Sequence, residues 1–183
     1  MENYEKLDPE KWRAYISALI KSMRRGMEDD AIYWGSVLYR FGRVKQAWRR
    51  ILIHVSEDIG PAEPNLPANI RALYENWKDL GKHDDAVLSY LHAISLMARA
   101  TKSRIIDHAK IIYIAGHFEQ SRPVPDYAFD HHGRVGREMG RGVDFFFDVA
   151  AQLHPLSEED DPYEDRAKQV ALKLEAEKKR LDS

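Results

Sequence analysis

The spacing of apolar residues constrains this chain more than any other feature, because it repeats with the period of an α-helix. The first stripe occupies positions i, i+3, i+4, i+7, i+8 and i+11 and consists of Trp12, Tyr15, Ile16, Leu19, Ile20 and Met23. Five similar stripes follow before residue 116. No segment sustains the two-residue alternation of a half-buried strand, so the sequence predicts an all-α fold.

Short connections between the predicted helices favour antiparallel neighbours in a compact multi-helix bundle. The amino-acid composition changes at Glu119, where a segment rich in glycine and arginine precedes a predicted apolar helix. We predict a domain over residues 1–154 (with 119–154 as its Gly/Arg-rich segment and apolar helix), an acidic linker over 155–162 and a charged helix over 163–183. That last helix would pack on the body or on a partner through Ala167, Val170, Leu174 and Leu181.

Composition limits the chemistry that the chain can support. The 183 residues include no cysteine, which excludes disulfides and thiolate metal sites and fits a reducing cytosol. No apolar stretch approaches the roughly 20 residues of a membrane span, so we expect a cytoplasmic protein without membrane contact. The GxxxxGK[ST], GxSxG and HExxH motifs are absent, so the sequence predicts a non-enzymatic protein that needs no cofactor.

The net charge of −2 hides a strong asymmetry. Residues 11–50 contain ten Lys or Arg and three acids, a net charge of +7, whereas residues 157–165 contain six acids and no base. The basic part predicts nucleic-acid phosphate contacts, or the two parts neutralise each other across a subunit contact. The candidate phosphate-binding residues here are Arg24, Arg25, Arg49 and Arg50. The helix dipole offers another reason for cations near a helix C-terminus, as at Lys21, Arg24 and Arg25.

The run GRVGREMGRG is a second candidate for phosphate binding. It places Arg134, Arg137 and Arg141 at helical separations, and glycine lets a phosphate approach the backbone closely. The alternative, which we favour, is that these arginines pair with carboxylates such as Asp144 or Asp148, or with the acidic linker.

The strongest enzyme-like cluster consists of Asp126, Asp130, His131 and His132. Carboxylates and imidazoles are ligands that Mn, Fe or Zn ions accept. The cluster comes from one short stretch beside prolines, and residues of this type also serve as caps and turn hydrogen-bonding groups. A small metal- or nucleotide-dependent enzyme built on this cluster is therefore the alternative function rather than the leading one.

Three stretches together carry a family resemblance. IKSMRRGMEDDAIYW (20–34) resembles the pattern HKSIRGSDPDAALYW, RRILIHVSEDIGPAEPN (49–65) resembles RRLVRIASEDIGLADP, and ARATKS (98–103) resembles A-x-x-PKS. These are signatures of the C-terminal helical region of the RarA/MgsA replication-associated recombination AAA+ ATPases, and the resemblance covers about residues 12–115. Thr101 departs from the pattern, which has proline there. The motif positions, to which we assign structural roles, are Lys21, Ser22, Glu57, Asp58, Gly60, Lys102 and Ser103.

The resemblance implies a helical collar like that of clamp loaders, in which subunits commonly assemble as tetramers. The ATPase motifs of the family have no counterpart here. PDYAFDHHGRVGREMGRG resembles the ending of short relatives that lack the ATPase module, so we expect a stand-alone short relative. The leading hypothesis is an oligomeric module of DNA replication, recombination or repair, a dimer or tetramer through the 142–154 helix. Its partners would be a separate AAA+ ATPase or replication proteins and, weakly, DNA. A purely structural interaction protein is a third reading.

The stretch Ser56-Glu57-Asp58 ends a predicted helix just before a proline corner. Adjacent residues on a helix point about 100° apart, which does not favour a catalytic carboxylate pair. We therefore expect Glu57 and Asp58 to hold the corner by pairing with basic residues of the first two helices, and Lys21 is the expected partner.

Overall fold

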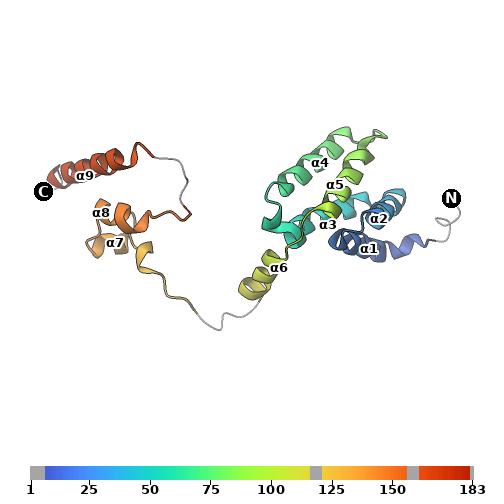
Figure 1. Cartoon of the computed structure of the whole chain (residues 1–183), viewed down its shortest axis with the longest axis horizontal. Coiled ribbons are helices and arrows are strands. Elements are labelled where there is room, and N and C mark those ends of the chain that lie inside the picture. Colours follow the sequence, from blue (N-terminus) through green and yellow to red (C-terminus); the bar gives the residue numbers. More distant parts are fainter. Residues whose placement is uncertain (1–6, 116–120, 156–160, 182–183) are drawn as a thin grey trace. The chain divides into compact units, whose positions relative to one another are not determined.

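The computed structural model describes residues 7–115, 121–155 and 161–181. These residues form helices and loops, and none of them lies in a β-strand, which confirms the all-α fold (Figure 1). The chain divides into two compact units, Met1–Phe118 and Glu119–Ser183. Within the described ranges, no helix has both the length and the apolar character that crossing a membrane requires.

The described part of the first unit consists of α-helices joined by short turns. Their bounds are α1 (Trp12–Arg25), α2 (Glu28–Arg40), α3 (Val44–His54), α4 (Leu66–Leu80), α5 (Ala86–Arg99) and α6 (Ile105–Lys110). Shorter helical turns occupy Pro9–Lys11, Val55–Ile59, Gly60–Ala62 and Ile111–Ala115. The turns at Val55–Ile59 and Ile111–Ala115 are wide turns of π-helix. The proline corner expected from the sequence thus begins with the π turn, which directly extends α3.

The core of the first unit lies where α1 to α5 meet. Trp48 of α3 is fully buried, and its ring packs against Tyr74 and Tyr90 with centroid separations of 5.3 and 5.6 Å. The α1 stripe predicted from the sequence is buried in this core except for Trp12, which is only partly covered. Each large apolar side chain buried in this way contributes about 1.5–3 kcal/mol to stability. The opposite, polar face of α1 is consequently turned to the surface.

The second unit has a much smaller core. Its elements are short turns at Asp126–Ala128 and Phe146–Ala150 and the helices α7 (Arg134–Glu138), α8 (Val143–Phe145) and α9 (Glu164–Leu181). Among its described residues, Val143 is the one buried large apolar side chain. Lys168 of α9 pairs with Asp148, which ties the C-terminal helix to the segment before it. Residues 119–154 therefore group with this helix, a division that differs from the predicted 1–154 domain. Residues 156–160 of the predicted linker lie outside the described ranges.

Within the second unit, α9 does not pack through its apolar stripe, which leaves contact with a partner as the alternative given from the sequence. Val170, Leu174 and Leu181 are exposed. The partly covered residues of the helix are Lys168, Ala171, Leu172 and Glu175, which repeat at i, i+3, i+4 and i+7. The ion pair of Lys168 with Asp148 lies on this covered face, beside the apolar side chains of Ala171 and Leu172. The predicted stripe is thus left on the surface of this unit.

Candidate functional site

A groove with a cavity volume of about 650 Å³ runs between α1 and α3 of the first unit. Its lining residues are Trp12, Arg13, Ile16, Ser17, Ile20, Lys21, Arg24, Gln46, Arg49, Arg50, Ile53, His54 and Glu57. Five of them are Lys or Arg, against the single carboxylate of Glu57. Isoleucines from both helices provide its apolar surface. The groove can therefore accept an anionic ligand that also has an apolar part.

The helical period explains why the cations converge. On α1, the side chains of Arg13, Ser17, Lys21 and Arg24 follow at i, i+4, i+8 and i+11, on the side opposite the core. On α3, Gln46, Arg49, Arg50 and Ile53 follow at i, i+3, i+4 and i+7. Positions with these spacings share one face of a helix. The groove is thus lined by the polar faces of both helices.

Lys21 and Arg49 are the cations best placed to bind a ligand. Both residues are exposed, and neither side chain takes part in an ion pair with any residue in the described ranges. By contrast, Arg50 donates to His54 Nε2 at 2.9 Å, and Arg24 pairs with Glu57 and Asp58. An incoming anion would compete with no carboxylate at Lys21 or Arg49.

One end of the groove is formed by an aromatic side chain among guanidinium groups. The guanidinium carbons of Arg13 and Arg43 lie 4.6 and 5.2 Å from the centroid of the Trp12 ring, within range of cation–π attraction. Arg13 is not among the candidates that the charge pattern of the sequence indicates. Its position eight residues before Lys21 places it on the same helix face and is the signal that identifies it.

The sequence-based candidates are therefore only partly brought together. Arg24, Arg49 and Arg50 line the groove, as does Lys21. Arg25 does not, because its guanidinium turns back to donate to the Lys21 carbonyl at 3.0 Å, at the C-terminal end of α1. That contact is the helix-end role given as the alternative for this residue.

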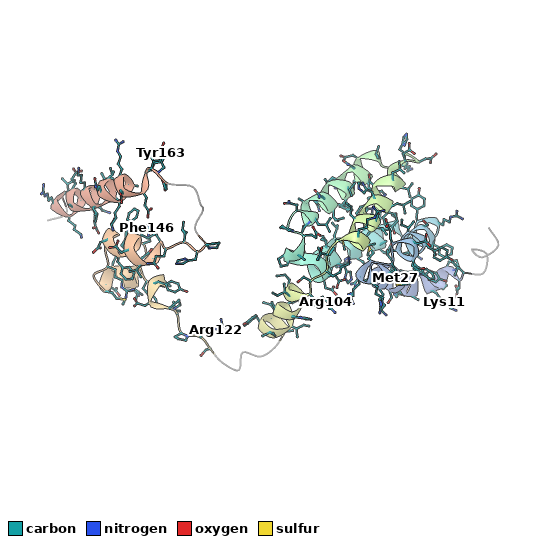
Figure 2. The ribbon with its side chains drawn as sticks, viewed as in Figure 1. Lys11, Met27, Arg104, Arg122, Phe146 and Tyr163 are labelled. Carbon is teal, nitrogen blue, oxygen red and sulfur yellow. The ribbon has the colours of Figure 1, made fainter. Side chains whose placement is uncertain are left out.

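The other end of the groove is a buried charge cluster around Asp58, which is 3% exposed. Arg24 Nη2 donates to Glu57 Oε1 at 3.1 Å. Arg24 Nε lies 2.9 Å from Asp58 Oδ1, which is within the distance of an ion pair, but the two groups are not aligned for a hydrogen bond. Arg104, at the start of α6, lies 3.6 Å from Asp58 and 3.5 Å from Glu57. Its side chain can be located in Figure 2. Two arginines thus face two carboxylates.

His54 links this cluster to the groove as a neutral ring. Arg50 can only donate, so its contact with Nε2 makes that nitrogen an acceptor and places the proton on Nδ1. Nδ1 then donates to Asp58 Oδ2 at 2.8 Å. Burial lowers the pKa of His54 below its usual 6.5, and this outweighs the opposite effects of Glu57 and Asp58. The ring therefore stays uncharged at neutral pH.

The expected pairing of the corner with Lys21 is wrong. Asp58 and Glu57 pair with Arg24, three residues further along α1, and with Arg104. The guanidinium group reaches both carboxylates at once, a geometry that a single ammonium group cannot match. Lys21 instead lines the open part of the groove. The structural role expected for Glu57 and Asp58 agrees with this geometry.

Two of the remaining motif residues, Gly60 and Ser103, lie at the same corner, and the other two lie in or near the neighbouring helices. Ser103 N donates to the Asp58 carbonyl at 2.8 Å, which joins the two motifs directly. Lys102 Nζ donates to the carbonyls of Ala98 and Ala100 at the end of α5. Gly60 has φ +49°, a conformation that favours glycine. Ser22 is buried within α1. These positions agree with the structural role expected from the sequence.

Two of the three arginines in the run GRVGREMGRG make internal contacts. Arg141 pairs with Asp126 and donates to the Phe129 carbonyl at 2.8 Å. Arg137 donates to the carbonyls of His131 and His132. The partners are thus mostly backbone oxygens and Asp126, rather than the Asp144 or Asp148 expected from the sequence. Asp148 pairs with Lys168 instead.

Arg134 differs from the other two arginines of this run. Its side chain is 82% exposed and lies 3.7 Å from Glu138. The four residues of the enzyme-like cluster also separate, because Asp126 is engaged by Arg141. Asp130, His131 and His132 remain together in one turn, with their ligand atoms within 4.8 Å of one another.

Fold and groove define the class of this protein as an all-α domain with a cationic surface groove. The chain belongs to the family described as MgsA AAA+ ATPase C terminal, whose model matches residues 26–176. The match confirms the resemblance and extends it beyond residue 115 into α9. The family description refers to the C-terminal part of an AAA+ ATPase. The sequence contains no Walker A motif.

Two similar proteins have the same name, Replication-associated recombination protein A. The one from Haemophilus influenzae is 29% identical over 138 residues, which cover 71% of this chain and 29% of the relative. The one from Bacillus subtilis is 27% identical over 134 residues, which cover 71% of this chain and 31% of the relative. The chain thus spans less than a third of the length of these relatives.

Proposed function

We propose that this chain is a non-enzymatic docking module of the replication or recombination machinery, and that it contacts DNA through the α1–α3 groove. The observation that carries the proposal is the convergence of five cations and one carboxylate on that groove. The names of the relatives support the biological setting. The absence of nucleotide-binding and hydrolase motifs from the sequence supports a role in binding rather than in catalysis.

The expected binding mode follows from the chemistry of the groove. Lysine and arginine attract phosphate and release its counterions, which gives affinity without reading the base sequence. Lys21 and Arg49 supply this attraction most directly because neither has to leave a carboxylate in the described part of the chain. The overall pI of about 6.5 is well below the value of ~9 typical of dedicated DNA-binding domains. Binding is therefore weak, independent of sequence and steeply salt-dependent.

Fluorescence anisotropy with labelled single- and double-stranded oligonucleotides tests this role. Arg49→Glu should lower affinity for every sequence tested, because it puts a carboxylate into the groove. Lys45→Glu is the matched control, since Lys45 is an exposed cation on the same helix that does not line the groove. Equal losses in the two variants would reduce the effect to net charge and reject the groove as the binding site.

We also propose that the module self-associates as a dimer or tetramer, and that a separate AAA+ ATPase or another replication protein is its partner. The supporting observation is an exposed apolar surface on α6 and the turn after it. It consists of Ile105, Ile106, Ile111, Ile112, Tyr113 and Ile114, which are 47–79% exposed. A concentration of exposed apolar side chains on one short segment is typical of protein contacts.

This surface replaces the 142–154 helix as the preferred contact. The phenylalanines of that helix are half-buried within the second unit, so they offer less apolar surface than the sequence suggests. Sedimentation velocity of Ile112→Lys tests the assignment, and the variant should shift the protein toward monomer. Leu88→Lys is the matched control, because Leu88 and Ile112 are both 61% exposed. A monomeric wild-type chain at micromolar concentration would reject self-association altogether.

A further inference from the structure

The turn that contains Asp130, His131 and His132 has a geometry that neither the DNA-binding groove nor the α6 surface explains. Each residue offers one ligand atom, and these atoms lie within 4.8 Å of one another. A tetrahedral Zn²⁺ ion with bonds of ~2.0–2.1 Å separates its ligand atoms by about 3.4 Å. Binding therefore requires the ligand atoms to approach by up to about 1.4 Å, the difference between 4.8 Å and about 3.4 Å, which side-chain rotation supplies.

The backbone of this turn is held in place from two sides. Asp130 Oδ1 accepts a hydrogen bond from the backbone N–H of His132 at 3.0 Å. Arg137 donates to the carbonyls of His131 and His132 at 3.1 and 2.8 Å. Gly136 packs so closely that a Cβ atom there would lie 1.8 Å from the Asp130 carbonyl oxygen. The three ligands are thus presented by a turn that is already ordered.

The imidazole rings also pack against an aromatic neighbour, and one of their nitrogens lacks a partner. The ring centroids of His131 and His132 are 4.0 Å apart, and Phe146 packs edge-on against both at 5.5 and 5.0 Å. The position of Phe146 is marked in Figure 2. His131 Nδ1 is buried without a hydrogen-bond partner in the part of the chain that the structure describes. A buried polar atom left unpaired is destabilising, and a metal bond would satisfy it.

The second unit has a small core, so a bound metal ion would add to its stability. Val143 is the one large apolar side chain buried among its described residues. Units of this size with little apolar core commonly depend on a metal or a disulfide for stability, and the chain has no cysteine. Metal binding to a folded site adds its free energy to that of folding.

We propose that Asp130, His131 and His132 form a site for a divalent transition metal, with Zn²⁺ as the preferred ion, that stabilises the second unit. Three protein ligands leave one tetrahedral position for water. His132 is exposed, which gives the ion access from solvent. Asp126 is not a ligand, because Arg141 engages it. His132 Nδ1 lies 3.0 Å from Asp130 Oδ2, and both atoms would exchange this contact for bonds to the ion. The cluster of His54, Glu57 and Asp58 is a poorer site, because the cationic side chains of Arg24, Arg50 and Arg104 contact it and would repel a metal ion.

Titration of the untagged full-length chain with Co²⁺, followed by visible absorption, tests the site, and calorimetry with Zn²⁺ measures affinity. Wild-type protein should bind one ion per chain and show the d–d bands of Co²⁺ bound to nitrogen and oxygen. His131→Ala and His132→Gln should each abolish the bands. His92→Ala is the matched control, because His92 is an exposed histidine of the first unit, and it should leave them unchanged.

Two further measurements separate ligation from folding. Arg137→Gln keeps every ligand but loosens the turn, and removal of such a supporting interaction should weaken Zn²⁺ binding by about 10–100-fold. Zn²⁺ should also slow hydrogen exchange in residues 121–155 of the wild-type chain but not of His132→Gln. The proposal is overturned if no Co²⁺ bands appear, or if His132→Gln binds Zn²⁺ as tightly as the wild type. Neither result depends on DNA binding.

Discussion

Replacement of Asp58 by asparagine tests the charge cluster that joins α1, α3 and α6. The side chain keeps its size but loses its charge. The NH2 group of the asparagine would face the donor of either His54 or Arg24, so one donor would lose its acceptor. Leaving a buried donor unsatisfied costs about 1–3 kcal/mol, and breaking a buried ion pair about 3–5 kcal/mol. Arg24 is 30% exposed and keeps Glu57 at 3.1 Å, so water and the remaining carboxylate offset part of the loss. We therefore expect Asp58→Asn to destabilise the first unit by about 2–3 kcal/mol.

Thermal unfolding followed by tryptophan fluorescence is the appropriate assay. All four tryptophans lie in the first unit, so the signal reports that unit alone. At roughly 4 °C per kcal/mol for a domain of this size, Tm should fall by about 8–12 °C. Asp79→Asn, at an exposed position on α4, is the matched control and should change Tm little.

A double-mutant cycle with Arg24→Gln isolates the pair itself. Because the two side chains contact each other, the combined loss should be smaller than the sum of the single losses by about 1–3 kcal/mol. The reasoning is refuted if Asp58→Asn lowers Tm no more than Asp79→Asn does. Strict additivity in the cycle would show that Arg24 and Asp58 do not interact.

Three further predictions concern other sites. Burial lowers the pKa of His54 in the folded chain. As the pH falls below about 6.5, the unfolded chain therefore binds a proton at His54 before the folded chain does, and the free energy of unfolding should decrease. Above that pH, His54 should not reduce the free energy of unfolding. His54→Gln should remove this slope in urea titrations between pH 5 and pH 7. Gly60→Ala should destabilise the corner by about 1–2 kcal/mol, since φ is +49° there. Equal stability of Gly60→Ala in chemical denaturation would contradict that strain. Arg141→Lys should lower the stability of the second unit by about 1–2 kcal/mol without changing DNA affinity, whereas a loss of affinity at unchanged stability would restore Arg141 as a phosphate contact.

Much of the first unit is predictable because helical periodicity reports which face of each helix is buried. The α1 stripe is of this kind. The same period explains why Arg49 and Arg50, which the charge pattern indicates, converge with Lys21 on one groove. Prediction works here because each side chain's face is set within its own helix.

Contacts between distant segments are not predictable in the same way. Choosing Arg24 over Lys21 as the partner of Asp58 requires the rotation of α1 against the π turn, which no local pattern encodes. Arg104 lies 46 positions beyond Asp58 in the sequence and reaches it only because Ser103 docks on the Asp58 carbonyl. In the second unit, the partly covered face of α9 contains Lys168, which pairs with Asp148, and not the apolar stripe. Most of these contacts pair charged groups, and the sequence offers many carboxylates for each cation.

The salt dependence of DNA binding tests the central proposal most directly. Anisotropy titrations between 50 and 200 mM salt should compare the wild-type chain with the double variant Lys21→Ala/Arg49→Ala and with Lys45→Ala. Removing one cation that neutralises a phosphate should reduce the slope of log K against log salt by about 0.7 on single strands and 0.9 on duplex. The slope of the double variant should therefore be smaller by about 1.4 to 1.8, while Lys45→Ala retains the wild-type value. An unchanged slope in the double variant, or no binding by the wild type at 50 mM salt, would contradict DNA docking through this groove.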